Sequence, residues 1–407
     1  MAVSLCGRSA VVRVEVMIRW ALLLCVVAAP AWAFPWMVKH NYGSCAVCHV
    51  DPSGSGQLTP YGRAQADVIV RWRTQPRNDE EEVPKSANFL WFLELPEFLN
   101  LSGNLRGGMM IRPGGSTPVF PLVMATDLYA TVNIGPVVGH LTTGVGRKAD
   151  QARILPQCEP GMGTCVWAWT AREFWAGVKF ADEAVMVRAG RANLPFGLRN
   201  NEHTSYVRAL TKTDVNVDQQ VGVLASYNSD VVRGEVMGIV GNFQMGPDIY
   251  RERGYSAYAE YSLSHNAYLG LSSLIAHAGA DSATTLETTR HAHGAFGRFA
   301  PTQKLSILAE ADFLAWQSPQ QLDRFGFAAF AQGDYELMNG LHLMGTLEGS
   351  YTGRSEPGPS LGGWVSGAWY FLPHMELRFD HIFRRVSNPG AAAAFEYTFL
   401  LQLHLFL

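Results

Sequence analysis

The sequence predicts an all-β protein: a transmembrane antiparallel β-barrel of about 16 strands that follows a small N-terminal helical segment. Three observations lead to this fold. Apolar and polar residues alternate from about Leu99 to Leu407, which is the period of strands with one apolar and one polar face. The connections between these runs alternate between short and long. Charged residues make up only 16% of the chain, against about 25% in soluble domains.

The alternation predicts which residues face lipid and which face the lumen. In the run 375–383, Leu377 and Phe379 share one face, while Glu376 and Arg378 lie on the other. The same pattern occurs in the runs 127–134, 305–313 and 341–351. The expected lumen face carries Asp127, Arg188, Glu260, Glu310, Asp312, Glu348, Arg378 and Asp380. We expect these charges to form a hydrated lining with mutual ion pairs; a cation pathway is the alternative.

The lengths of the connections favour a membrane barrel over a soluble sandwich. Short turns are expected at 135–136, 181–183, 228–230, 264–266, 338–340 and 372–374. Longer loops are expected at 113–118, 149–164, 194–218, 245–253, 279–288, 317–323 and 353–360. Short turns at one end, long loops at the other and an even number of strands are typical of outer-membrane barrels. About 16 strands leave a lumen wide enough for water or a plug, and both termini would be periplasmic.

The N-terminus has the features of an export signal. Arg13 and Arg19 form a positive region, residues 21–29 form an apolar core, and Ala31-Trp32-Ala33 is a small-x-small cleavage site. An uncleaved membrane anchor is the alternative. We therefore divide the chain into a signal peptide (1–33), a short segment described next (34–85) and the barrel (86–407).

The segment after the signal contains a haem attachment motif. Cys45-Ala46-Val47-Cys48-His49 has the spacing of c-type haem attachment. Two thiols add to the two vinyl groups of haem, and the adjacent histidine ligates the iron. A zinc site needs a second Cys/His pair at ligand spacing, and the sequence offers none. The motif therefore predicts one covalent haem c on Cys45, Cys48 and His49, outside the cytoplasm.

The haem segment is too short to enclose a porphyrin alone. Only about 35 to 45 residues separate His49 from the first strand, and chains of this size rarely bury enough surface to be stable by themselves. We expect the segment to share a wall with the barrel, at its inner mouth or inside its lumen. His40 is our candidate for the sixth iron ligand, with Met37, Met338, His342, His374, His404 and a vacant position as alternatives. We expect a helix from Tyr61 to Arg73. Within it, Arg63 is expected either to contact a haem propionate or to be exposed to solvent.

Cys158 and Cys165 are expected to form a disulfide. They flank a six-residue loop, and exported proteins encounter an oxidising environment. His277, His291 and His293 are a second metal-site candidate, at the outer mouth, with polar rim residues as the alternative. The net charge of −3 and the lack of basic runs predict no nucleic-acid partner.

An exported Cys-x-x-Cys-His segment fused to a porin-like barrel resembles the outer-membrane cytochrome–porin fusions of iron-oxidising bacteria. The matching residues are 42–49 and 58–63, which include Tyr61-Gly62-Arg63 after the haem motif. That family has phenylalanine at the position of Tyr61, and the spacer Ser53-Gly54-Ser55-Gly56 departs from its pattern. The resemblance implies a monohaem cytochrome that moves electrons between the outside and the periplasm.

The expected partners are outer-membrane lipid, a periplasmic c-type cytochrome and an external redox partner, for which Fe²⁺ is one candidate. Fe²⁺ oxidase activity is left open. One alternative function is an outer-membrane transport porin whose haem segment acts as a plug or sensor. A haem enzyme such as a peroxidase would need an open iron position beside an acid/base residue, and the sequence offers no such pair.

Overall fold

The computed structural model describes residues 36–40, 42–73, 88–113, 119–149, 165–199, 202, 205–242, 251–281, 284–353, 359–386 and 394–407. The side chains of 120, 146–149, 165–168 and 386 are not described. The predicted signal peptide lies outside these ranges. So does Cys158, and of Cys165 only the backbone is described, so the predicted disulfide is outside the described part of the chain.

Sixteen antiparallel strands form one closed barrel, which confirms the predicted fold. The first eight are β1 (Leu99–Ile111), β2 (Val119–Ile134), β3 (Val137–Ala149), β4 (Cys165–Phe180), β5 (Val185–Ala192), β6 (Gln220–Asn228), β7 (Val232–Gly241) and β8 (Glu252–Ser264). The others are β9 (Ala267–Ala278), β10 (Thr288–Thr302), β11 (Leu305–Ser318), β12 (Gln321–Met338), β13 (Leu341–Tyr351), β14 (Ser360–Leu372), β15 (Met375–Val386) and β16 (Ala394–Phe406). Among the described residues, no helix is long and apolar enough to cross a membrane.

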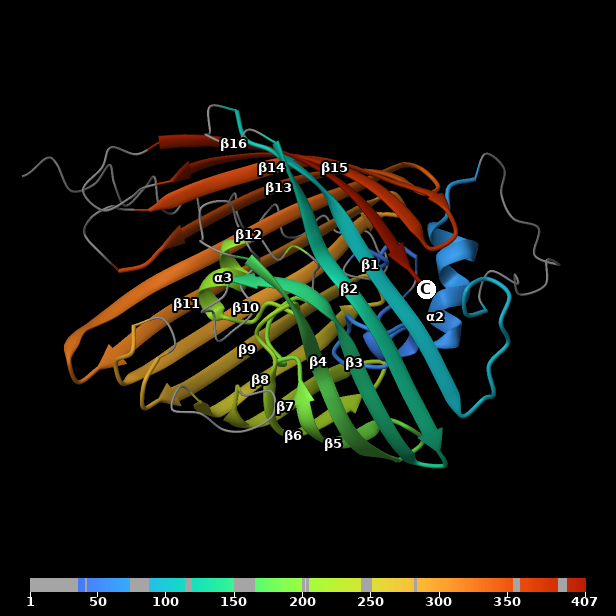
Figure 1. The fold of residues 1–407 in the computed structure, drawn as a ribbon, viewed down its shortest axis with the longest axis horizontal. Coiled ribbons are helices and arrows are strands. Elements are labelled where there is room, and N and C mark those ends of the chain that lie inside the picture. Colours follow the sequence, from blue (N-terminus) through green and yellow to red (C-terminus); the bar gives the residue numbers. More distant parts are fainter. Residues whose placement is uncertain are drawn as a thin grey trace, which may run out of the picture.

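The barrel closes between its first and last strands. β1 pairs with β16 from Asn104↔Phe406 to Ile111↔Phe399, and the backbone N–H of Leu407 donates to Gly103 at 2.8 Å. The C-terminus therefore lies at the end of the barrel where the strands are joined by short turns (Figure 1). We call this the short-turn end.

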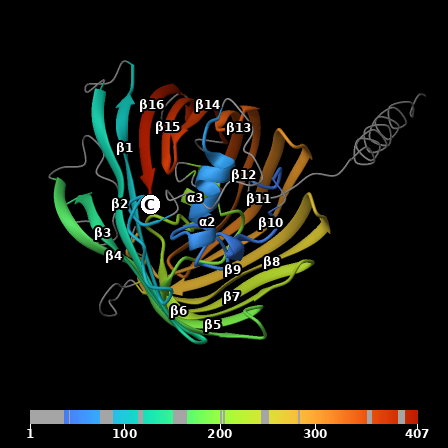
Figure 2. The same ribbon diagram turned by 90° about the vertical axis from the view of Figure 1, so that its right-hand side faces the viewer.

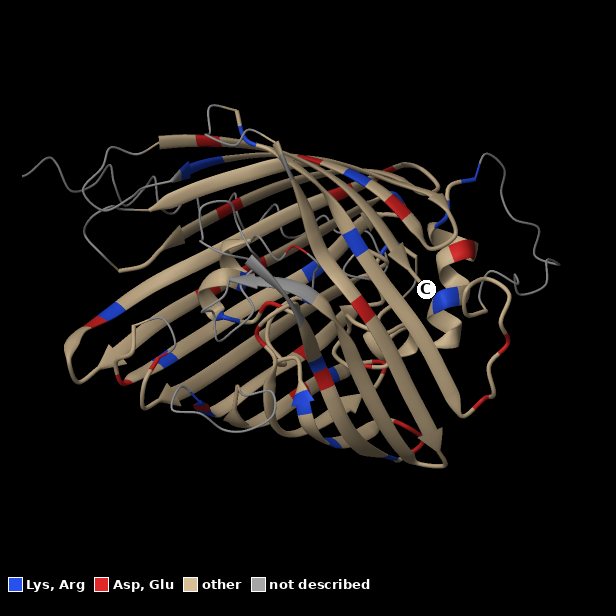
Figure 3. Ribbon diagram, in the orientation of Figure 1, with Lys and Arg blue, Asp and Glu red and all other residues tan. Residues whose placement is uncertain are grey.

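The strand faces follow the predicted alternation. Along β13, Leu343 and Leu347 are exposed, whereas Thr346 and Glu348 are buried inside. All eight charges predicted for the lumen face are buried. Charged positions are interspersed along the strands (Figure 3), and the outward row is apolar, as a lipid-facing wall requires.

The six predicted short turns are confirmed, and a seventh at 303–304 joins β10 to β11. The predicted long loop 317–323 is wrong. β11 continues to Ser318 and β12 begins at Gln321, so only two residues connect them. Polar residues there occupy extended strand ends rather than a loop. Residues 387–393, between β15 and β16, were not predicted as a loop.

The connection between β5 and β6, predicted as a long loop beyond the end of the barrel, instead turns into the barrel in its described residues. Leu194, Phe196 and Leu198 are buried in one cluster with inward-facing strand residues. Ser256 of β8 donates to the carbonyl of Pro195 at 2.9 Å. The helix α3 (Tyr206–Thr211) packs against β11, β12 and β13. We call the described residues of this connection, 193–199, 202 and 205–219, the inward loop.

Candidate functional site

Residues 36–40 and 42–73, here called the plug, occupy the short-turn end of the barrel. The plug contains a 3-10 turn (Cys45–Val47), α2 (Pro60–Gln65) and a π-helical turn (Ala66–Val70). The predicted helix over 61–73 therefore begins one residue earlier and ends at Val70. Viewed from the short-turn end, α2 lies within the ring of strands (Figure 2). The expectation that this segment shares the barrel wall is met by the contacts that follow.

Buried ion pairs hold the plug to the wall. Asp51 lies 2.8 Å from the guanidinium of Arg188 on β5, which is also 2.7 Å from Glu235 on β7. Lys39 lies 2.8 Å from Asp334 and 3.1 Å from Glu336, both on β12. Burial alone raises the pKa of the Asp51 carboxyl, but the guanidiniums of Arg188 and Arg199 outweigh it and lower the pKa to about 2. Asp51 is therefore the ionised partner that the buried Arg188 requires.

Hydrogen bonds add further anchors at other strands. Gln57 donates to the carbonyl of Asn100 on β1 at 2.9 Å, and Arg298 on β10 donates to the carbonyl of Gly43 at 2.7 Å. The turn between β12 and β13 contacts the end of the plug. Gly340 there has a φ of +75°, and a Cβ atom on it would overlap the backbone of Trp72, so this contact requires glycine.

One helical turn brings the haem-motif residues together. The backbone N–H groups of Cys48 and His49 both donate to the carbonyl of Cys45, at 3.1 and 2.9 Å. Both thiols are free, with Cys48 buried and Cys45 partly buried. Burial raises the pKa of the Cys48 thiol to about 11 and lowers the pKa of His49. His49 is therefore held as the neutral imidazole that ligates metals.

Helix α2 packs directly on this turn. Thr59 caps the helix by accepting from the N–H of Gly62 at 3.0 Å. A Cβ on Gly62 would overlap the carbonyl oxygen of Cys48, so only glycine lets the two backbones approach so closely. The glycine of Tyr61-Gly62-Arg63 is thereby explained as a packing requirement of the motif.

The motif faces a cavity between the plug, the inward loop and the wall. The cavity has a volume of about 230 Å³, below the roughly 300–1,000 Å³ of typical ligand sites. Its lining includes Cys45, Cys48 and His49 from the plug, and Leu308, Met344 and Tyr370 from the wall.

Arg199 of the inward loop provides an independent test of fit. It lines the same cavity, and its Cβ lies 3.7 Å from the position of a Cβ on Gly54, near Cys45. All three of its guanidinium nitrogens are buried, and none has a hydrogen-bond partner within the described ranges. Arg199 interacts electrostatically with Asp51, but buried N–H groups without acceptors are unfavourable. A haem propionate would supply the acceptor oxygens that this guanidinium lacks.

Arg63 and His40 have protein partners. Arg63 is buried and donates to Asn100 at 2.8 Å and to the carbonyl of Leu101 at 2.6 Å, so its solvent-exposed alternative is wrong. The Nε2 of His40 lies 3.1 Å from Glu336. The roles predicted for Arg63 on a propionate and for His40 on the iron stay predictions. Arg199 was missed because its loop was expected beyond the end of the barrel.

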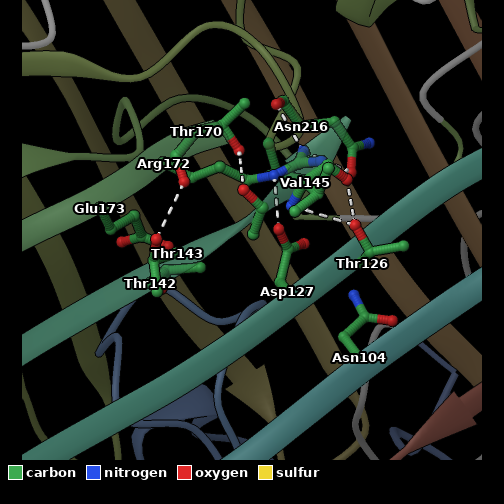
Figure 4. A network of polar contacts seen from close by, with 12 residues as sticks. Asn104, Thr126, Asp127, Thr142, Thr143, Val145, Thr170, Arg172, Glu173 and Asn216 are labelled. Atoms are coloured by element: carbon green, nitrogen blue, oxygen red, sulfur yellow. Dashed lines mark hydrogen bonds and ion pairs between the residues drawn. The ribbon is translucent and has the colours of Figure 1, made fainter. Parts of the chain in front are cut away.

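The lumen charges are largely paired rather than lining open water. Asp127 lies 2.9 Å from Arg172, which donates to the carbonyl of Asn216 in the inward loop at 2.5 Å (Figure 4). Arg208 of α3 pairs with Glu310 on β11. Further pairs join Glu202 to Arg378, Arg290 to Glu252 and Arg298 to Glu260. The predicted mutual ion pairs are confirmed, and many of them fix the inward loop to the wall.

The second metal-site candidate does not assemble. His291 and His293 alternate with the buried Arg290 and Ala292 along β10, so they lie on its outward face. The Nδ1 of His293 lies 3.0 Å from the hydroxyl of Ser273, and that of His277 lies 3.0 Å from Thr289. In the described part of the chain, no group of three His, Cys, Asp or Glu side chains is placed to hold a metal ion.

Solved structures with a similar fold are bacterial outer-membrane proteins. No protein-family model and no curated protein matches the sequence. The loop L8 deletion mutant of OmpT from Vibrio cholerae is 9% identical, covers 76% of this chain and 99% of its own, and has a TM-score of 0.58. The outer membrane channel DcaP of Acinetobacter baumannii is 11% identical, with 76% and 97% covered and a TM-score of 0.55. The anion-selective porin from Comamonas acidovorans is 8% identical, with 76% and 99% covered and a TM-score of 0.54. At these identities the likeness establishes a porin-like barrel fold.

Proposed function

We propose that this chain is an outer-membrane monohaem c-type cytochrome fused to a porin-like barrel. It passes electrons between an extracellular donor or acceptor and a periplasmic cytochrome. The observation that carries the proposal is the shared cavity: Cys45, Cys48 and His49 line one space with Arg199, whose buried guanidinium nitrogens have no hydrogen-bond acceptor among the described residues. The resemblance of residues 42–49 and 58–63 to cytochrome–porin fusions supports the same assignment.

Each side chain has a definite part in holding the group. Cys45 and Cys48 supply the two thioether bonds, His49 supplies the proximal nitrogen, and Arg199 neutralises a propionate. Bound haem c supplies a reversible one-electron couple at its iron. The wall and plug exclude water and lower the local dielectric, which sets the potential of that couple.

The electron balance is simple. An external one-electron donor, with Fe²⁺ as a candidate, is oxidised, and a periplasmic acceptor is reduced by one electron. The inward loop and the plug approach each other inside the lumen, where a Cβ on Gly54 would lie 3.7 Å from that of Arg199. A solute crossing the barrel would therefore have to separate buried ion pairs on both segments, whereas an electron needs no opening.

The proposal is tested in liposomes that enclose an electron acceptor. Wild-type protein is expected to reduce the enclosed acceptor when a reductant that cannot cross the membrane is added outside. The Cys45→Ser/Cys48→Ser double variant, folded but without attached haem, is expected to show only background reduction. Equal rates for the two proteins would refute the conduit. Solute flux that changes with haem redox state, without electron transfer, would instead support the transport porin with a haem-bearing plug.

Arg199→Gln is expected to keep haem attached but lower its reduction potential. Losing the positive charge favours the ferric state, and a tenfold change in the equilibrium constant corresponds to about 59 mV for one electron. Arg199→Lys keeps the charge and is expected to shift the potential much less. Redox titration of both variants measures this. An unchanged potential in Arg199→Gln would contradict the propionate contact.

A further inference from the structure

Four histidine or methionine side chains other than His49 line the haem-motif cavity. They are Met37, His342, Met344 and His404. Histidine and methionine are both axial ligands of haem iron in proteins. The structure distinguishes these candidates by what each side chain already contacts.

His404 has no free ring nitrogen. Its Nδ1 lies 3.0 Å from Glu376, and its Nε2 lies 2.9 Å from the amide oxygen of Asn104. Met37 and Met344 belong to one apolar cluster with Val70, Ala368 and Tyr370. No second group orients either thioether within that cluster.

His342 has the arrangement of a prepared metal ligand. Its Nδ1 lies 3.0 and 3.2 Å from the two carboxylate oxygens of Asp334. The Nδ1 also lies 3.3 Å from the ammonium of Lys39, which can only donate. The carboxylate of Asp334, which accepts from Lys39 at 2.8 Å, lies closer to Nδ1 than the ammonium does, so we assign the proton to Nδ1. The Nε2 lone pair is then free, and Nε2 has no hydrogen-bond partner within the described residues. Ligating histidines commonly donate their other N–H to a carboxylate in this way.

Neighbouring aromatic rings fix the imidazole. The centroid of Trp36 lies 4.6 Å from that of His342, and Tyr370 lies at 5.5 Å, nearly perpendicular to it. His342 is on β13, eight strands around the 16-strand barrel from β5. Arg188 of β5 holds Asp51, two residues after His49. The plug and the wall thus present one histidine each to the cavity, from different sides of the lumen.

We propose that the Nε2 atom of His342 would bind the haem iron as its second protein ligand beside His49, and that Asp334 is its positioning residue. This inference rests on the proposed haem, and it differs from the prediction of His40, which pairs with Glu336 instead. Lys39 links the plug to the same carboxylate, so docking of the plug and orientation of the ligand depend on one ion pair.

The test is the spin state of the purified full-length haemoprotein. Wild-type protein is expected to be six-coordinate and low-spin, with two nitrogen ligands by electron paramagnetic resonance. His342→Gly is expected to become largely high-spin and to bind carbon monoxide when reduced, and added imidazole is expected to restore the low-spin spectrum. His342→Gln, which keeps the side-chain bulk, is the second variant in case glycine hinders folding. Met344→Leu and Met37→Leu, both on the same cavity, are matched controls expected to keep the wild-type spectrum.

Three results would overturn the assignment: a high-spin wild-type protein, an unchanged spectrum in both His342 variants, or loss of the low-spin signal in a methionine variant alone. A different measurement tests the proposed function itself. A wild-type pyridine haemochrome spectrum without thioether-bonded haem would remove the haem itself, whereas any result above requires that haem to be present.

Discussion

Purified Cys45→Ser/Cys48→Ser protein is expected to contain a folded barrel and no covalently attached haem. The two thiols are the only free cysteines in the described residues, and each forms one thioether bond. Single variants are expected to retain one bond and to show a ferrous absorption band displaced to longer wavelength, because one vinyl group stays conjugated to the ring. Denaturing gels stained for haem and pyridine haemochrome spectra measure both effects.

The control for this prediction is a substitution outside the cavity. Lys179→Met removes an exposed ion pair with Glu183 on a short turn and is expected to bind haem at the wild-type level. Barrel folding in all variants is checked by heat-dependent gel mobility. Covalent haem in the double variant, or its loss in Lys179→Met, would contradict the assignment of the two thiols.

The second large effect is expected from Arg188→Met. Asp51 and Glu235 would remain buried with no cation between them, and breaking a buried ion pair by removing one partner costs about 3–5 kcal/mol. We expect the plug to leave the barrel mouth and become sensitive to protease while the strands remain protected. Limited proteolysis followed by mass spectrometry of the released fragments measures this.

Two comparisons make the proteolysis result decisive. The triple variant Asp51→Asn/Arg188→Met/Glu235→Gln removes all three charges together and is expected to be protected better than Arg188→Met alone. Lys179→Met is expected to behave as the wild type, because exposed pairs contribute at most about 1 kcal/mol. If Arg188→Met and Lys179→Met proved equally protected, the triad would not be holding the plug.

The strands were predictable because each has one apolar and one polar face, a pattern that local sequence carries. The loop at 317–323 was not, since polar residues at strand ends look the same as loop residues. The inward loop had a signal that was not used. Leu308 and Leu314 fall on the polar face of β11, and Leu224 and Met237 face inward on β6 and β7. Apolar side chains inside a barrel need a cover, and the inward loop provides it.

The haem motif is a prediction from local sequence, because attachment chemistry fixes the spacing of its residues. Its surroundings depend on contacts between residues hundreds of positions apart. His342 was one of several candidates in the sequence, and only its distances to Asp334, Lys39 and Trp36 separate it from His404. The role proposed for Arg199 likewise depends on the burial of its guanidinium nitrogens, which local sequence does not show.

The enclosure of Cys48 has a consequence for biogenesis. In the docked plug Cys48 is 8% exposed, and α2 covers the backbone beside it. Under the proposed function, we therefore expect thioether formation to precede docking of the plug. The plug also hydrogen-bonds to β1, the strand that seals against β16. Under the proposed function, the segment that carries the haem would therefore be fixed to the same strand that closes the barrel.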